Sequence, residues 1–368
     1  MPGGLEQIAP KLSQLVDETV RRLTAPEQGA VRSIGRPLVA LVATFGGVAA
    51  IIAALGASPV DAFHALIVGA LGNTFSFGQT VMITSILALT GLAAAIPFSA
   101  RLWNVGGEGQ LYFGAFTAAG VALTLPHDLP HWFLAPLVVL ASAGGGAVWG
   151  AVPGLLKAGF GANEVITSLM MTFVAILLAD YAITVLWPQG ALPQTEYVPG
   201  NATLPNIWTG TLVTAGAPLA VLAVLAAWVL VSRTALGFEI RAIGLNANAS
   251  RLNGIPIKRV TVLTFLAGGA FAGLAGGINV LGMNNALIDH FSVEFGFLGI
   301  AVALVARLSP AWILPSAFFF AVLRVGSGGL QVETGLSKSV GEIIVATFLL
   351  LLLNLHVIRI RYAEAAEQ

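Results

Sequence analysis

Long apolar segments, separated by short polar connections, run through most of the chain. A helix needs about 20 apolar residues to cross about 30 Å of hydrocarbon. The expected membrane helices cover residues 37–57, 78–98, 109–126, 132–156, 165–187, 215–232, 260–283, 297–308, 311–330 and 340–357. Residues 297–308 are too few to cross alone, so we expect a broken helix or one extended by the residues before it. The shorter run 62–71 fits a re-entrant or interfacial helix.

The composition agrees with this pattern. Of the 368 residues, 57% are hydrophobic and only 9% are charged, and the mean hydropathy is +0.89. Such values lie outside the range of soluble domains. The segments are also too long for the alternating ~10-residue strands of an outer-membrane barrel. The sequence therefore predicts an all-α polytopic membrane protein with about ten transmembrane helices. The absence of cysteine excludes disulfides and thiolate sites.

The positive charges place both termini in the cytoplasm. Cytoplasmic connections are enriched in Lys and Arg, and in this orientation all 17 such residues except Lys338 and Arg324 fall inside. We expect residues 1–36 to form a cytoplasmic amphipathic segment without the features of a signal peptide. Residues 37–357 would form the transmembrane domain, and residues 358–368 a cytoplasmic tail.

The longest polar interruption on the cytoplasmic side, residues 233–259, is strongly basic. Its charged residues are Arg233, Arg241, Arg251, Lys258 and Arg259 and the single acid Glu239. The centre of this loop, residues 241–251, is expected to form a short amphipathic helix on the membrane surface. Such a helix is well placed to be bound and moved by a soluble partner protein.

The number of segments predicts an inverted repeat. Five segments precede and five follow the middle of the chain, and an odd number per half gives the two halves opposite orientations. A short echo supports this: Asn104-Val-Gly-Gly-Glu-Gly-Gln110 leads into the third segment and Ser292-Val-Glu-Phe-Gly296 into the eighth. Each places an acid beside glycine at the start of an apolar segment, as in discontinuous helices that build a site near the bilayer midplane.

Charged residues in or near the segments are candidates for function, because they are costly in a membrane. Glu108 is either a functional group or a carboxylate that caps free helix amides. Glu164 lies near the cytoplasmic face and fits a cap or an interface. Asp180 and Arg324 lie in the outer halves of their segments and could form an ion pair.

Other chemistry finds little support in the sequence. No Gly-Lys dipeptide occurs, so a Walker A loop is absent, and HExxH and GxSxG motifs are missing as well. His127 and His131 flank an outer turn and fit loop residues better than metal ligands. Glycines at spacings of four fit close helix packing: Gly146, Gly150, Gly269, Gly273 and Gly277.

Three sequence blocks stand out together. They are Asn104-Val-Gly-Gly-Glu-Gly-Gln-Leu, Gly161-Ala-Asn-Glu-Val-Ile, and Arg241-Ala-Ile-Gly-Leu-Asn with Ala249-Ser-Arg-Leu-Asn-Gly-Ile. They resemble the membrane permease subunit of bacterial ABC importers in the branched-chain amino acid and simple-sugar superfamily. The likeness extends from about residue 37 over nearly the whole chain. The Gly-Gly-Glu-Gly-Gln form is similar to that of nucleoside importers served by basic-membrane-protein-type receptors.

The resemblance implies a transport subunit without its own ATPase site, in the inner membrane of a bacterium. Its partners would be a second homologous permease, a cytoplasmic ATPase with two nucleotide-binding halves, an extracytoplasmic solute-binding protein and membrane lipid, with no nucleic acid. ATP and Mg would be bound by the ATPase, and this chain would hold no cofactor. The 233–259 loop would dock on the ATPase through Arg241, Gly244, Asn246, Ser250, Arg251 and Gly254.

The implied solute is a nucleoside, which is neutral and carries a flat base and a hydroxylated sugar. Its path needs amides and aromatic rings more than charges. The predicted path residues are Asn104, Glu108, Gln110, Asn279, Asn284, Asn285 and Phe295. Simple sugars and branched-chain amino acids are alternative solutes. An ion-coupled secondary transporter would instead use Glu108, Glu294 and Asp180 as coupling groups, and a channel or a membrane scaffold is a third reading.

Overall fold

The computed structural model describes residues 58–292 and 294–334, together with residues 45–50, 52, 53, 56, 343, 346 and 347. The chain divides into two compact units, and the larger, Phe63–Gly341, carries almost everything described below. The predicted N-terminal segment and C-terminal tail lie outside the described residues, as do most of the predicted helices 37–57 and 340–357.

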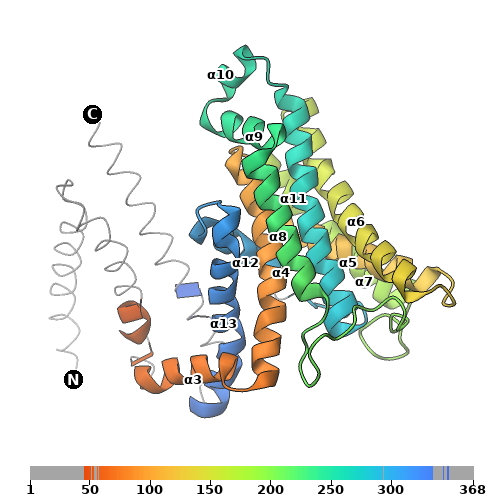
Figure 1. Ribbon diagram of the computed structural model, residues 1–368, viewed down its shortest axis with the longest axis vertical. Helices are drawn as coiled ribbons and strands as arrows, with labels where there is room; N and C mark the ends of the chain where they lie inside the picture. Colours follow the sequence, from red (N-terminus) through yellow and green to blue (C-terminus); the bar gives the residue numbers. More distant parts are fainter. Residues whose placement is uncertain are drawn as a thin grey trace, which may run out of the picture. The chain divides into compact units, whose positions relative to one another are not determined.

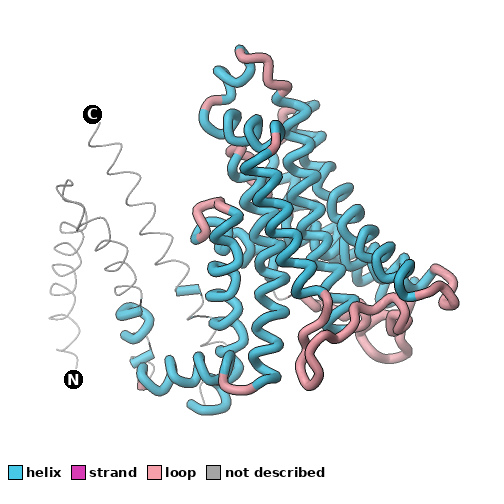
Figure 2. The backbone as a smooth tube through the Cα atoms, in the orientation of Figure 1, coloured by secondary structure: helices cyan, strands magenta, loops and turns pink. Residues whose placement is uncertain are grey.

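The described chain is helical, as the sequence predicts. Its helices are α3 (Pro59–Leu71), α4 (Thr74–Ser99), α5 (Gly107–Thr124), α6 (His131–Phe160), α7 (Glu164–Tyr181), α8 (Gly216–Arg233), α9 (Ala235–Leu245), α10 (Ala247–Leu252), α11 (Ile257–Asn279), α12 (Phe295–Val305) and α13 (Pro310–Thr334) (Figure 1). Two π-helical ends continue α7 and α11, namely η1 (Ala182–Leu186) and η2 (Val280–Asn284). Within the described residues no strand forms beyond isolated bridges, and loops gather at the ends of the helices (Figure 2).

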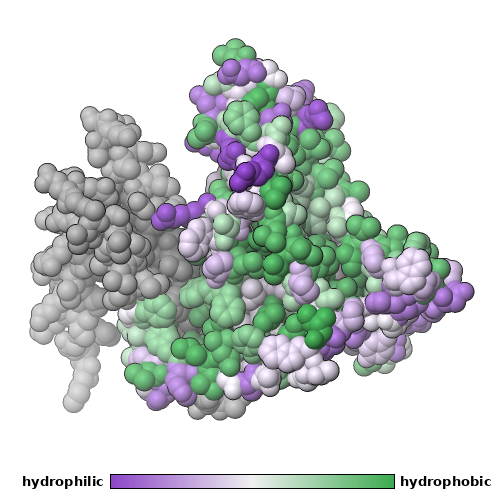
Figure 3. All heavy atoms as spheres, viewed as in Figure 1, coloured by the Kyte–Doolittle hydropathy of each residue, from purple (hydrophilic) through white to green (hydrophobic). Residues whose placement is uncertain are grey.

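Six described helices are long and apolar enough to cross a membrane: α4, α6, α7 with η1, α8, α11 with η2, and α13. Hydrophobic side chains cover the middle of the visible helices, whereas hydrophilic ones gather around α9, α10 and the loops at the opposite end (Figure 3). This distribution is that of a multi-pass membrane protein. The predicted short run at 62–71 is the 13-residue helix α3, which runs across the axis of α4 and meets α13 where Gly69 lies against Gly329.

The core is centred on α4 and α11. Of their most apolar stretches, 89% and 67% of residues are buried, against 28% for α7 and 33% for α8. The predicted glycine packing is confirmed where α11 crosses α6. A Cβ added at Gly146 would collide with the backbone of Gly269 and Gly273, so only glycine allows this approach.

Local sequence explains where the helices begin and end. Asn73 starts α4 by accepting a hydrogen bond from the Ser76 amide at 2.8 Å. Gly161 ends α6 in the left-handed conformation (φ 70°), which glycine adopts without steric cost. Asn163 then starts α7 by accepting from the Val165 amide at 3.0 Å. A turn of only a few residues therefore joins α6 to α7.

The glycine contact gives a matched stability test. Gly146→Ala inserts a methyl group against the α11 backbone, and we expect it to destabilise the chain by about 1–3 kcal/mol. Gly144→Ala, two residues away on the same helix, meets no atom within 4 Å and serves as the control. The measurement is thermal unfolding of the purified chain in detergent. Equal midpoints for the two variants would contradict the close α6–α11 approach.

Candidate functional site

The chain reverses direction after α4 and runs back into the helical bundle. The Ala100 and Leu102 amides both donate to the Pro97 carbonyl, and Arg101 between them is left-handed (φ 56°). Residues 100–106, called here the re-entrant linker, form no helix. Asn104 then donates through Nδ2 to the Ala93 carbonyl at 3.1 Å. Since Ala93 lies about 9 Å before the end of α4, the helix that follows begins within the bundle rather than at its edge.

Two predicted path residues form a closed amide pair at this depth. Asn104 donates to Gln110 Oε1 at 3.0 Å, and Gln110 donates back to Asn104 Oδ1 at 3.0 Å. Both residues are only 1% exposed. The pair satisfies buried amides with one another, as buried polar groups require.

A second helix, α12, also begins inside the bundle. Its 11 residues span only about 16 Å, half of the hydrocarbon thickness, so of the two predicted alternatives the structure shows the short, broken helix. Glu108 Oε2 accepts a hydrogen bond of 2.5 Å from the Gly296 amide, and Ser292 Oγ accepts from the Phe295 amide at 3.3 Å. Glu108 therefore caps free helix amides, one of the two predicted roles. The amides belong to α12 rather than to its own helix.

The remaining predicted path residues lie apart from this pair. Asn284 donates through Nδ2 to Asn279 Oδ1 at 2.7 Å across the π-helical end of α11. Asn285, which follows, is exposed and left-handed (φ 53°). Phe295 is buried beside Gly296 and so belongs with Glu108. The structure thus gathers the predicted residues into two groups, one at the start of α5 and α12 and one at the end of α11.

The predicted pairing of Asp180 with Arg324 is wrong. Asp180 lies beside Asp289 and His290, near the C-terminal end of α7, and no ion pair joins it to Arg324 within the described residues. The prediction failed because residues 285–292, which form no regular helix, bring Asp289 to the end of α7. His131 lies with Nδ1 3.0 Å from the Asn201 carbonyl, and the described part of the chain holds no cluster of three metal ligands.

The basic 233–259 loop folds into two helices, α9 and α10. The prediction of one short helix over 241–251 is wrong, because the chain breaks at Asn246 in the middle of that range. Asn246 caps α10 by accepting from the Ala249 amide at 3.0 Å, and Thr234 caps α9 by accepting from the Gly237 amide at 3.1 Å. Ser250 Oγ donates to the Asn246 carbonyl at 2.9 Å.

Of the other predicted docking residues, some hold the segment on the helical bundle or turn the chain, and one is exposed on its surface. Gly244 lies directly against the Ser99 carbonyl at the end of α4, and Arg241 Nη1 donates to the Val231 carbonyl near the end of α8. Gly254 turns the chain in the left-handed conformation (φ 82°). Arg251 is exposed. Gly244 and Arg241 therefore hold α9 on the ends of α4 and α8.

Sequence reasoning missed three apolar side chains on α9 and α10, called here the apolar tips. Phe238, Leu245 and Leu252 are 62%, 80% and 89% exposed, on a segment whose other exposed residues include Arg251 and Lys258. Phe238 and Leu245 are seven residues apart on α9 and so share one face of that helix, whereas Leu252 ends α10 beyond the break at Asn246. Exposed apolar groups rimmed by charge are typical of surfaces that contact another protein or a membrane.

Comparison with known proteins supports a common origin with transport permeases. The family described as the branched-chain amino acid transport system permease component matches residues 76–353. The nucleoside ABC transporter permease NupB of Lactococcus lactis is 32% identical over 91% of this chain and 94% of its own. The glucose permease TsgB13 of Haloferax volcanii is 36% identical (87% and 87%), and the guanosine permease NupP of Bacillus subtilis is 31% identical (88% and 94%). No solved structure matches the chain significantly.

If Glu108 caps α12, its substitutions should lower the stability of the chain to different degrees. Glu108→Ala leaves the buried Gly296 amide without its acceptor, and we expect it to lower the free energy of unfolding by about 1–3 kcal/mol. Glu108→Gln keeps an acceptor oxygen and should lose less. Glu294→Ala, at an exposed acid two residues before Gly296, is the control. Thermal unfolding in detergent measures all three, and a Glu108→Ala midpoint equal to that of the control would refute the cap.

Proposed function

Because the chain belongs to the family of branched-chain amino acid transport system permease components, we propose that it is the nucleoside-carrying permease of an ATP-driven importer. It is an ABC transporter permease and a multi-pass membrane protein. We place it in the bacterial cytoplasmic membrane, with both termini and the α9–α10 segment on the cytoplasmic side. The basic residues of that segment favour this orientation.

The contact of α9 with α4 carries this proposal. An ATPase moves a permease only if the docked segment is attached to helices that reach the solute path. Gly244 meets the Ser99 carbonyl at one end of α4, and Asn104 bonds the Ala93 carbonyl further along the same helix. A force applied to α9 therefore reaches the re-entrant linker through one rigid element.

The proposal includes a ten-helix, five-plus-five inverted repeat. Its support is the pairing of α5 with α12, the third and eighth predicted segments. Both begin inside the bundle after non-helical chain, and Gly107 of α5 lies against Gly296 of α12. Interrupted helices that meet at their amino ends are typical of transporters with inverted repeats. The buried helices α4 and α11, which are the second and seventh predicted segments, also contact one another.

A nucleoside is the proposed solute, and glucose is the second candidate. Two of the relatives above are named for nucleoside or guanosine transport, and one for glucose transport. Both solutes are neutral and rich in hydrogen-bonding groups. The asparagines at the end of α11 offer amides for either, and Phe295 offers a ring for a flat base.

The assembly would contain further chains. We propose a second homologous permease, an ATPase with two nucleotide-binding halves and an extracytoplasmic solute-binding protein, all within membrane lipid and without nucleic acid. ATP and Mg would be bound by the ATPase alone. The exposed apolar tips fit a groove on such an ATPase, and the surrounding basic residues fit an acidic rim.

The docking surface predicts a selective loss of coupling. Leu252→Asp places a charge on the most exposed apolar tip, and we expect solute-stimulated ATP hydrolysis to fall about tenfold, as for a lost interface hot spot. Phe160→Ser, at an 86% exposed ring outside α9 and α10, is the control. The assay uses proteoliposomes with the partner permease, the ATPase and the receptor. Unchanged stimulation in Leu252→Asp would exclude these tips from the ATPase contact.

The solute is tested by uptake in the same proteoliposomes. Nucleosides should drive ATP hydrolysis and accumulate, whereas glucose and leucine at equal concentration should not. Alanine at Asn279 or Asn284 should reduce uptake severalfold while leaving assembly intact. Stimulation by glucose alone would keep the importer and replace the solute. Normal uptake after alanine substitution at every predicted path amide would remove the proposed lining.

A further inference from the structure

One face of α7 carries a row of buried polar side chains. Most residues of this helix are partly or fully exposed, and its buried residues are Glu164, Ser168, Thr172, Ala175 and Ala179. The first three are polar and recur every four residues, so they lie above one another along three turns. Buried polar groups on a membrane helix need partners, and those partners identify what the row does.

The partners come from the re-entrant linker and the start of α5. The Val105 amide donates to Ser168 Oγ at 3.3 Å, and the Glu164 carboxylate lies against the Trp103 amide. A Cβ added at Gly106 would lie 2.8 Å from the Ser168 carbonyl oxygen, and one at Gly109 would lie 2.5 Å from Thr172 Cα. Successive residues of the row on α7 therefore contact successive residues of the re-entrant linker and the start of α5.

This arrangement answers a requirement of the bilayer. Backbone outside a helix is tolerated at membrane depth only where it is buried in protein and its polar groups are satisfied. The linker amide of Val105 has no helical acceptor and donates to Ser168 of α7, while the Glu164 carboxylate of α7 lies near the Trp103 backbone. Without these acceptors the linker amides would carry an uncompensated desolvation cost.

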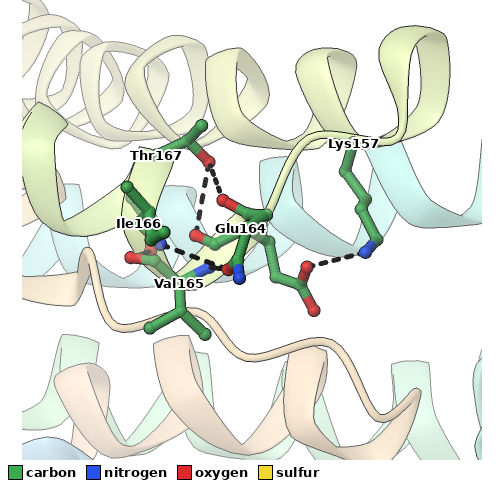
Figure 4. Close-up of polar contacts among 7 residues, drawn as sticks. Lys157, Glu164, Val165, Ile166 and Thr167 are labelled. Carbon is green, nitrogen blue, oxygen red and sulfur yellow. Dashed lines mark hydrogen bonds and ion pairs between the residues drawn. The ribbon is translucent and has the colours of Figure 1, made fainter.

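An ion pair fixes the end of the row at the start of α7. Lys157 Nζ of α6 lies 2.8 Å from Glu164 Oε2, and the two side chains are only 34% and 11% exposed. Figure 4 shows the lysine reaching across the short α6–α7 turn to the carboxylate. Asn163 caps the same turn. The Glu164 carboxylate is therefore held in place between Lys157 and the linker.

We infer that the polar row Glu164–Ser168–Thr172, anchored by Lys157, positions the re-entrant linker and through it the Asn104–Gln110 pair and the Glu108 cap. The residues act through the linker and do not touch solute. In the importer this row sets the register of the α5 break relative to α12. The transport consequence rests on the proposed function, but the positioning itself does not.

The natural absence of cysteine permits a direct test. Leu102 lies in the linker and is 8% exposed, so a cysteine in Leu102→Cys should react slowly with a maleimide in inverted membrane vesicles carrying the full chain and its partners. Ser168→Ala in that background should raise the labelling rate about five- to tenfold, the change expected for one lost hydrogen bond. Glu164→Leu should raise it further, and Glu164→Gln, which keeps an acceptor, should raise it less.

Two controls separate positioning from general loosening. Thr167→Val removes the neighbouring hydroxyl, which bonds only the Asn163 and Glu164 carbonyls of its own helix. It should leave Leu102→Cys labelling unchanged. A second reporter, Ala220→Cys at a fully buried site of α8, should stay unreactive in every variant.

Equal labelling in Ser168→Ala and Thr167→Val, or parallel increases at both reporters, would overturn the inference. In the assembled importer, Ser168→Ala should raise the half-saturating solute concentration more than it lowers the maximal uptake rate. Labelling requires neither solute nor ATP. A failed uptake assay beside the expected labelling pattern would therefore count against the proposed function and leave the positioning row intact.

Discussion

Every element near the candidate site answers one constraint: backbone amides at helix breaks inside a membrane must find acceptors within the protein. In the part of the chain that the structure describes, such breaks precede α5 and α12. At the first break Ser168 supplies an acceptor from α7, and at the second Glu108 supplies one from α5. A continuous helix would need neither. The polar residues of this core are therefore needed to satisfy the backbone amides at the breaks, whether or not they also contact a solute.

Helix α4 joins the two breaks to the basic segment α9–α10. Its Ala93 carbonyl holds the linker, its Ser99 carbonyl meets α9, and Thr90 is in close contact with Gly299 of α12. These contacts lie on one almost fully buried helix. A packed helix moves as a unit because protein interiors resist local deformation. A displacement of α9 relative to the bundle is thus transmitted to both interrupted helices together.

Periodicity and charge predicted most of the fold, because spans, glycine contacts and helix caps depend on local sequence. The short length of 297–308 even signalled the break before α12. Pairings between distant segments could not be read in this way. The predicted pairing of Asp180 with Arg324 rests only on their similar depth in the membrane. In the structure the non-helical residues 285–292 instead bring Asp289 next to Asp180. The role of Ser168 was hidden for the same reason, since its partner Val105 lies 63 residues away.

The family match and the position of Glu108 both disfavour the ion-coupled transporter that the sequence left open. A carboxylate that couples transport to an ion must be free to bind and release it during each cycle. Here the Glu108 carboxylate accepts from the Gly296 amide in a site that is 3% exposed, and releasing that amide would uncap α12. Ion binding would therefore compete with the structure of the half-helix. A carboxylate committed to that cap suits a transporter driven from outside the membrane, through α9 and α4, better than one driven by an ion at its centre.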